Sequence, residues 1–205
     1  MRKWKKITVQ RVFKYYFLAF FICILSACSS APQQNSQKDE YQREIDYYSQ
    51  IIQINPKNVE AYKKRADNYF YLECYHEALE DLTIVIELSP QSDKLLNMRT
   101  HIYFLLGQNQ DALKDANRAI EINPEDAINH FNRGMLYYYM KYYKEALKDI
   151  NQAIMINPTD LDFFDGRGLI YEKLSKNTKD ESLSEMYRQK SEDDFAAAEA
   201  MKSSE

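Results

Sequence analysis

Prolines recur in this 205-residue chain at a constant spacing. Four of the five stand 34 residues apart, each preceded by Asn or Ser: Pro56, Pro90, Pro124 and Pro158. Proline ends a helix because it lacks the backbone N–H and clashes with the preceding turn. A fixed period of this length is typical of helical hairpins that stack side by side and share a core. The spacing therefore predicts an all-α fold built from repeated helix pairs.

Other residue types recur with the same period. With proline counted as position 32, full repeats cover 59–92, 93–126 and 127–160, and a fourth begins at 161. Small side chains let two helix backbones approach closely, and large ones fill the space beside them. Position 8 holds Ala66, Thr100, Gly134 and Gly168, and position 11 holds Tyr69, Tyr103, Tyr137 and Tyr171. Position 20 holds Ala78, Ala112 and Ala146, position 24 holds Leu82, Ala116 and Ile150, and position 27 holds Val85, Ala119 and Ala153.

This pattern resembles the tetratricopeptide repeat (TPR) family over residues 41–201. The resemblance implies an all-α, right-handed solenoid of helical hairpins. We expect an N-terminal capping helix at 39–56, then TPR 1 at 59–92, TPR 2 at 93–126 and TPR 3 at 127–160. TPR 4, at 161–201, departs from the pattern by an 11-residue insertion. There we expect a first helix at about 161–174, an expanded polar segment from Ser175 to Ser182, and a long terminal helix.

An arginine at position 7 and an aspartate at position 23 recur along the array. Folding a hairpin about positions 15 and 16 brings position 7 near position 23, and the next turn brings position 23 near position 7 of the following repeat. We expect partly buried, bidentate Arg–Asp contacts. A structural role is favoured over a charged binding strip because every copy occupies the same position. The set is Arg65, Arg99, Arg133 and Arg167, with Asp81, Asp115, Asp149 and, after the insertion, Asp194.

The resemblance also indicates where a partner would bind, because positions 2, 5, 9 and 12 of the first helices line the concave face in TPR arrays. In the third repeat all four positions are apolar, and an apolar patch on such a face usually marks a contact. One hypothesis is a groove for a peptide, with acidic residues of the fourth repeat favouring a basic partner. The predicted groove residues are Phe70, His101, Phe104, Ile128, Phe131, Met135, Tyr138, Asp162, Asp165 and Leu169.

A second hypothesis is that the same patch packs under the chain's own terminal helix or at a homodimer seam. The sequence favours neither hypothesis. One known TPR binding mode is excluded, namely the clamp that holds the C-terminal carboxylate of chaperones. Its basic and amide positions are occupied here by Lys63 but then by Asp67, Met98, Ile128 and Asn132.

The N-terminus has the features of a secretion signal. Residues 1–14 contain six basic residues and no acid, and 13 uncharged residues follow. That apolar run is too short for a permanent membrane-spanning helix. Leu25-Ser26-Ala27-Cys28 resembles the lipobox of bacterial lipoproteins, which implies cleavage after Ala27 and acylation of Cys28. We expect a signal peptide at 1–27 and a lipidated, disordered tether at 28–38.

The residues after the anchor and the net charge bear on location. Ser29 and Ser30, rather than Asp, follow Cys28, and in lipoproteins this implies the outer membrane, facing the periplasm. In a Gram-positive cell the same anchor implies the outer face of the plasma membrane. Without residues 1–27 the chain has 21 basic and 31 acidic residues, a net charge of −10. Such a charge disfavours nucleic acid and electrostatic docking to anionic lipid, so membrane attachment would be covalent.

No catalytic set is apparent. His76, His101 and His130 show no metal-ligand spacing with Cys74, and the four glycines form no phosphate-binding loop. Cys74 would be the single free thiol of the mature chain. We therefore expect no enzyme, cofactor or metal, but an envelope adaptor or assembly factor that binds protein partners. The alternatives are a self-associating structural scaffold and, in another class, a lipid-anchored hydrolase, which a buried His–acid constellation would support.

Overall fold

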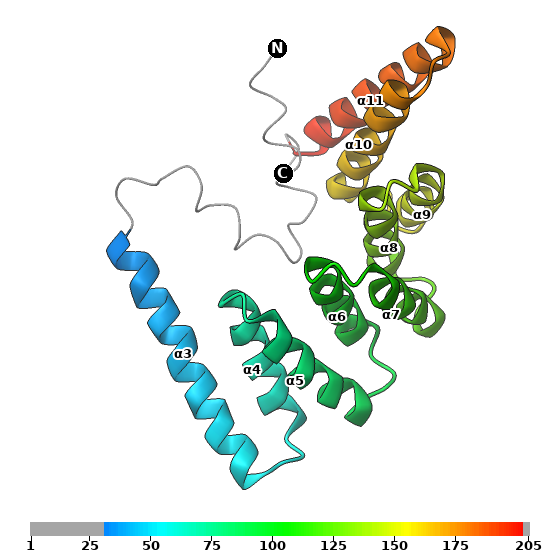
Figure 1. The fold of residues 1–205 in the computed structure, drawn as a ribbon. Helices are drawn as coiled ribbons and strands as arrows, with labels where there is room; N and C mark the ends of the chain where they lie inside the picture. The colour runs from blue at the N-terminus through cyan, green and yellow to red at the C-terminus, as the bar shows by residue number, and fades with distance from the viewer. Residues whose placement is uncertain (1–30, 203–205) are drawn as a thin grey trace. The chain divides into compact units, whose positions relative to one another are not determined.

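The computed structural model describes residues 31–202, and the secondary structure of this part of the chain is helical (Figure 1). The signal peptide and Cys28 lie outside these residues. The helices are α3 (Ala31–Ile54), α4 (Val59–Tyr71), α5 (Tyr75–Leu88), α6 (Asp93–Leu105), α7 (Asn109–Ile122), α8 (Ala127–Tyr139), α9 (Tyr143–Ile156), α10 (Leu161–Asn177) and α11 (Glu181–Lys202).

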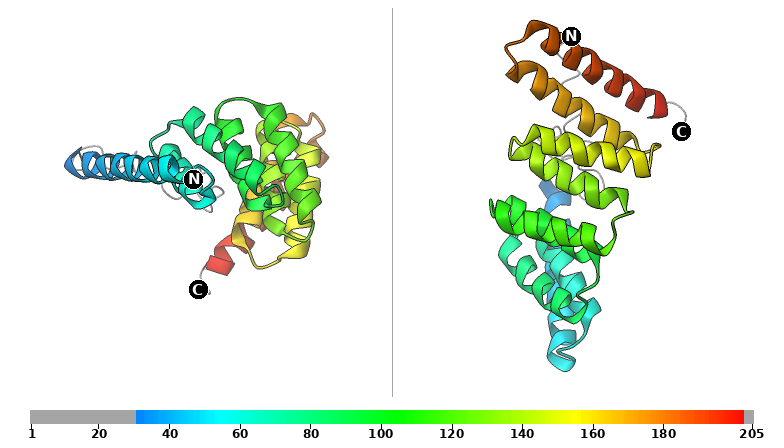
Figure 2. Two further views of the ribbon diagram at one scale, coloured as in Figure 1. Left: turned by 90° about the horizontal axis from the view of Figure 1, so that it is seen from below. Right: turned by 90° about the vertical axis from the view of Figure 1, so that its right-hand side faces the viewer.

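The described residues form two compact units. The N-terminal unit, 31–122, consists of α3 and the hairpins α4–α5 and α6–α7; the C-terminal unit, 123–202, consists of the hairpins α8–α9 and α10–α11 (Figure 2). Each unit has its own apolar core. Leu82 and Val85 of α5 are fully buried in the first, and Phe163 and Ile150 are fully buried in the second. Burial of these side chains between paired helices is the main stabilising contribution in each unit.

The turn inside each of the first three hairpins has one geometry. Position 15 has a positive φ in all three: Glu73 (61°), Gly107 (73°) and Lys141 (67°). In the first hairpin the Glu73 N–H donates to the Phe70 carbonyl and the Cys74 N–H to the Tyr69 carbonyl, the two bonds of a Schellman motif. Only Gly107 adopts this backbone without strain, because a Cβ clashes with the backbone in the left-handed region.

The turn between hairpins starts the next helix in the same way each time. Position 34 supplies an N-cap, with its side-chain oxygen accepting from a backbone N–H of the first helical turn. The caps are Asn58 to Ala61 (3.0 Å), Ser92 to Leu95 (3.4 Å), Asp126 to Ile128 (2.9 Å) and Asp160 to Asp162 (3.0 Å). Such a cap satisfies one of the unpaired donors at a helix start and stabilises it by about 1 kcal/mol.

Each arginine at position 7 forms a two-pronged ion pair with the aspartate at position 23 of its own hairpin. Arg65 Nε donates to Asp81 Oδ2 and Nη2 to Asp81 Oδ1, both at 2.7 Å. Arg99 pairs with Asp115 at 2.6 and 2.9 Å, and Arg133 with Asp149 at 2.7 and 2.8 Å. The carboxylates are almost completely buried, so the pair forms between packed helices rather than in water.

Three of these arginines also donate a hydrogen bond from Nη1 to the second helix of the preceding hairpin or, for Arg65, to α3. The acceptor is the residue at position 25 and not the aspartate at position 23 that we expected. Arg65 Nη1 donates to Ser49 Oγ of α3 (3.0 Å), Arg99 Nη1 to Thr83 Oγ1 (3.3 Å) and Arg167 Nη1 to Asn151 Oδ1 (2.9 Å). A neutral acceptor suffices here because the aspartate already neutralises the guanidinium charge. The hydrogen bonds to Asp81, Asp149 and Asp194 raise the pKa of Arg65, Arg133 and Arg167 respectively.

The first described helix is longer than predicted. It begins at Ala31, so residues 31–38 are helical and the predicted disordered tether at 28–38 is wrong over these residues. Proline is tolerated in the first turn of a helix, where Pro32 stands, and the three glutamines and the lysine that follow are good helix formers. A small, polar composition was therefore not sufficient to prevent helix formation.

The fourth repeat accommodates its insertion by extending both helices. Helix α10 runs to Asn177 and α11 begins at Glu181, so the expected polar segment from Ser175 to Ser182 is mostly helical. The extensions are tied together by Ser184 Oγ, which donates to the Ser175 carbonyl (3.0 Å). Arg167 and Asp194 are 27 residues apart instead of 16, yet they form the same pair at 2.7 and 2.9 Å.

Removing one aspartate of this set should cost much more stability than removing a surface acid on the same helix. Asp115→Ala leaves the Arg99 guanidinium, whose side chain is 15% exposed, without its anion, and we expect a loss of about 3–5 kcal/mol in the free energy of unfolding. Urea denaturation followed by circular dichroism measures it.

The matched control is Glu121→Ala on the same helix. Glu121 pairs with Arg118 in solvent, with the two side chains 63% and 49% exposed, so its loss should cost less than about 0.5 kcal/mol. Equal midpoints for the two variants would contradict a structural role for the buried pair.

Candidate partner-binding surface

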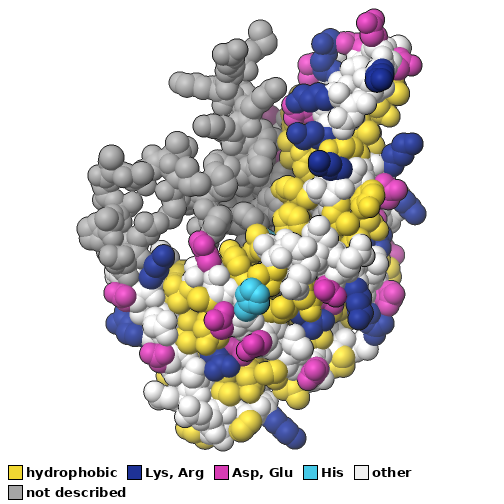
Figure 3. All heavy atoms as spheres, viewed as in Figure 1, with side chains coloured by type: hydrophobic (Ala, Val, Ile, Leu, Met, Phe, Trp, Pro, Cys, Tyr) yellow, Lys and Arg dark blue, Asp and Glu magenta, His cyan; other side chains and the backbone are white. Residues whose placement is uncertain are grey.

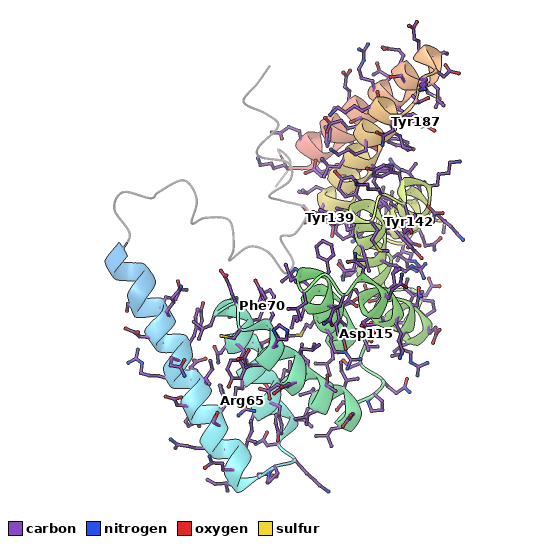
Figure 4. All side chains as sticks on the ribbon, viewed as in Figure 1. Arg65, Phe70, Asp115, Tyr139, Tyr142 and Tyr187 are labelled. Carbon is purple, nitrogen blue, oxygen red and sulfur yellow. The ribbon has the colours of Figure 1, made fainter. Side chains whose placement is uncertain are left out.

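The inner-face residues of the N-terminal unit lie together on α4 and α6. Phe70 stands at the C-terminal end of α4 (Figure 4), and its ring centroid is 5.4 Å from that of His101 on α6. Phe70, His101 and Phe104 are each half-buried. Three predicted groove residues of this unit are therefore partly accessible, and two of them are in contact.

Two tyrosines that the repeat positions do not mark extend this set. Tyr71 is exposed, and its ring centroid lies 6.0 Å from that of Phe70. The Tyr71 ring also stacks on Tyr41 of α3, with centroids 5.1 Å apart and an interplanar angle of 14°. Tyr41, Tyr71, Phe70 and His101 thus form a continuous aromatic strip across α3, α4 and α6. The adjacency of Tyr69, Phe70 and Tyr71 is a sequence signal for such a surface, but the contribution of α3 is a tertiary contact.

Charges beside the aromatic strip are of both signs. Burial raises the pKa of the Asp67 carboxyl, and the nearby Lys63 and Lys64 oppose that shift. Burial also raises the pKa of Tyr71, and Asp67, four residues earlier and so on the same side of α4, adds to the effect. Burial lowers the pKa of His101 to about 4, so the imidazole is neutral at pH 7. The strip therefore offers aromatic faces with a partly desolvated carboxylate beside them.

In the C-terminal unit the predicted groove anchors belong to the core instead. Phe131 is 5% and Met135 4% exposed, and Phe131 packs on Phe163 with ring centroids 5.0 Å apart. A Cβ on Gly166 would stand 3.0 Å from Phe131 Cε2 and 3.4 Å from Met135 Sδ. The glycine lets α10 approach α8 closely, and the two side chains lie in that contact. They are therefore not available as groove anchors in this structure.

Of the other predicted groove residues in this unit, three are buried and two are half-buried. Leu169 is buried in the core, and Asp162 and Asp165 are also buried, so they do not form an open acidic strip. Ile128 and Tyr138 stay half-buried. Burial raises the pKa of Tyr138 to about 12, with Tyr143 and Glu172 adding to the shift. The hypothesis that the apolar patch packs within the chain thus holds for Phe131 and Met135, although α10 rather than the terminal helix covers them.

The histidines and cysteine do not converge. His130 is buried and its Nε2 lies 2.8 Å from the Pro124 carbonyl oxygen, a packing role at the start of α8. Within residues 31–202 no three His, Cys, Asp or Glu side chains are placed to hold a metal ion. None of the helices α3 to α11 combines the length and the apolar character that a membrane span needs.

Comparisons with known proteins agree with this fold. The tetratricopeptide repeat model matches residues 127–160, and a TPR repeat model matches 101–141. Among solved structures, the chain is similar to MamA, with 21% identity, a TM-score of 0.68, and coverage of 83% of this chain and 94% of that one. It is also similar to YrrB, described as a TPR protein with an unusual peptide-binding site, with 22% identity, a TM-score of 0.61, and coverage of 79% and 81%.

A third similar structure is the first TPR of Spaghetti (RPAP3) bound to the HSP90 peptide SRMEEVD, with 23% identity, a TM-score of 0.53, and coverage of 57% of this chain and 93% of that one. No curated protein matches the sequence. At these identities the likeness to solved structures shows the fold, which is an all-α TPR solenoid, and the family models show TPR repeats between residues 101 and 160.

Because Phe131 is a core residue, its truncation should act on stability. We expect Phe131→Ala to lower the free energy of unfolding by about 3–5 kcal/mol, since the cavity between α8 and α10 can close only partly. Thermal and urea denaturation measure this. Tyr142→Ala, at an exposed ring in the same unit, is the control and should cost less than about 1 kcal/mol. Similar losses for both variants would contradict the buried position of Phe131.

Proposed function

We propose that this chain is an adaptor or assembly factor of the bacterial envelope that binds a peptide or protein segment on the inner face of its TPR helices. The observation that carries the proposal is the aromatic strip of Tyr41, Tyr71, Phe70 and His101, which crosses three helices and remains partly accessible. Aromatic residues are enriched where proteins contact partners. On the face seen in Figure 3, hydrophobic side chains gather in patches between charged ones.

The similar structures support binding as the kind of activity. YrrB is described as having a peptide-binding site, and the RPAP3 domain is bound to a peptide. Helical-repeat folds bury their hydrophobic faces against neighbouring repeats and use the remaining surface for recognition rather than catalysis. By analogy, this chain would hold an extended or helical segment of another protein.

The chemistry of the strip favours a partner segment with apolar or basic side chains. A lysine or arginine above Phe70 or Tyr71 would gain a cation–π interaction, and Asp67, one helical turn before Tyr71, would supply the counter-charge. Because Asp67 is already partly desolvated, its pairing with a cation would be stronger than that of a solvent-exposed acid. An acidic segment would instead meet a carboxylate at this place.

A self-associating scaffold is the second candidate, and the exposed Tyr47 and Ile54 of α3 favour it as an additional property. A lipid-anchored hydrolase is the third possibility, and it would require a buried histidine paired with an acid.

Partner capture should depend on Tyr71 and not on an equally exposed tyrosine elsewhere. We expect a photo-crosslinking residue at Tyr71 to trap a discrete envelope protein, and the same residue at Tyr142 to trap none or a different one. Mass spectrometry of the adducts from living cells identifies the partner. Phe70→Ala should reduce the Tyr71 adduct at least roughly tenfold, as expected for a buried aromatic contact. Adducts of equal yield and identity at both sites would contradict the proposal.

Envelope attachment rests on the lipobox and is tested separately. We expect Cys28→Ser to abolish incorporation of labelled palmitate and to move the protein from the membrane to the soluble fraction, since several acyl chains provide the anchor. Cys74→Ser is the control and should leave labelling unchanged, because Cys74 immediately precedes α5 in the folded unit. Membrane retention of the Cys28 variant would contradict a lipid anchor.

A further inference from the structure

Helix α3 occupies the place of a second helix, and within residues 31–202 no first helix precedes it. Ser49 of α3 accepts a hydrogen bond from Arg65, and Thr83 of α5 accepts the equivalent hydrogen bond from Arg99. Ser49 therefore stands at position 25, and α3 follows the register of a second helix. It runs without interruption from Ala31 to Ile54. Residues 31–38, which would belong to a first helix in a full repeat, are therefore part of α3 itself.

This register identifies which face of α3 lacks a partner. In α5, positions 20, 23, 24 and 27 face the first helix of the hairpin and are buried as Ala78, Asp81, Leu82 and Val85. In α3 the same positions hold Glu44, Tyr47, Tyr48 and Ile51, with Ile54 one turn further. Tyr47 is 59% and Ile54 85% exposed, and Tyr48 and Ile51 are only partly buried. These four positions are buried in α5, α7 and α9, whereas in α3 Tyr47 is accessible and Tyr48 and Ile51, which pack against the edge of the core, are only partly covered.

The composition of the face excludes a TPR first helix as its partner. The first helices of this chain carry an arginine at position 7 that requires the aspartate at position 23. At this position α3 has Tyr47, which cannot neutralise a guanidinium. All four arginines are already paired within their own hairpins, so exchanging one of these helices onto α3 would break a buried ion pair.

The face is, however, complementary to itself. Glu44, Tyr47, Ile51 and Ile54 are spaced three and four residues apart, which places them in one stripe along the helix. If two such stripes run antiparallel with Tyr47 of one copy against Ile54 of the other, Glu44 comes to the turn that follows α3 of the other copy, where Lys57 is exposed. A parallel arrangement would instead put Glu44 against Glu44 and Glu40 against Glu40.

We propose that the chain forms a two-fold symmetric dimer through antiparallel contact of α3 with α3 of a second copy. A symmetric pair presents the same patch from both copies and closes on itself, so association stops at two chains. A single helix pair buries less than the roughly 1,200 Å² of stable complexes, and we therefore expect a dissociation constant in the micromolar range. The dimer does not depend on the proposed partner-binding surface, and either can fail without the other.

Cysteine crosslinking tests the antiparallel register at two exposed positions, so folding is not at risk. In full-length chains with Cys74→Ser, Tyr47→Cys and Ile54→Cys are introduced separately and carry tags of different size. Because a disulfide needs Cα atoms within about 7 Å, mixing the two variants should give the mixed dimer on oxidation. Each variant alone should give little, because identical positions are offset by about 10 Å along the helix.

Gln53→Cys, on the solvent face, replaces one partner in the control mixture and should give no more dimer than the parent chain. A preference for Tyr47 with Tyr47 would indicate parallel helices and overturn the proposal. Crosslinking no higher than in the control would overturn it as well, and the face would then be a contact surface for a different protein.

A charge exchange tests the Glu44–Lys57 contact without oxidation. In sedimentation of the full-length chain in mild detergent, Glu44→Lys and Lys57→Glu should each raise the dissociation constant roughly three- to tenfold, and the double variant should return it to near the parent value. Gln53→Lys, outside the stripe, is the control for added charge on the solvent face. A monomeric parent at tens of micromolar, or a double variant no better than the single ones, would overturn the proposed geometry.

Discussion

A carboxylate between two packed helices is strongly destabilising unless a cation or hydrogen-bond donors compensate its charge. In this chain that requirement is met four times by an arginine from the first helix of each hairpin, with both Nε and Nη2 on the aspartate. The planar guanidinium fits a carboxylate in one orientation only, so the pair fixes the rotation of one helix against the other as well as their distance. Small residues permit close packing, and the ion pair selects one arrangement among the many that packing alone would allow.

The orientation of the first helices has consequences for recognition. On α4, Arg65 and Phe70 are five residues apart, so they point to different sides of the helix. While Arg65 is held by Asp81 and Ser49 inside the unit, Phe70 is directed toward Tyr71 and His101. The buried charges thus determine which residues of α4 remain for a partner. A binding surface held in this way is pre-organised, which lowers the entropic cost of binding.

Periodic features of the fold could be predicted from the sequence, because the same residue at the same position has the same environment in each hairpin. The prolines gave the hairpin boundaries, and Asp194 could be matched to Arg167 across the insertion. The same period also marks the N-caps Asn58, Ser92, Asp126 and Asp160, which stand two residues after each proline. The positive φ at Glu73 and Lys141 could not be read from residue type, since only Gly107 signals it.

Features that depend on contacts between different repeats were less predictable. Phe131 and Met135 satisfied the spacing of an inner face, but Gly166 on the neighbouring helix allowed α10 to cover them. Helical spacing specifies a face of one helix and does not specify how closely the next helix approaches. The aromatic strip was only partly predicted for the same reason, since Tyr41 comes from α3. The start of α3 at Ala31 depends on weak propensities over a few polar residues, where composition discriminates poorly.

The central claim is that the buried arginine–aspartate pair, rather than packing alone, holds each hairpin in register. A double-mutant cycle at Arg167 and Asp194, with Arg167→Met and Asp194→Leu, tests it most directly, because this pair persists across a separation of 27 residues. The coupling energy comes from the free energies of unfolding of the parent, the two single variants and the double variant. We predict a favourable coupling of at least about 2 kcal/mol. A value below about 0.5 kcal/mol, as for exposed pairs, would contradict the account.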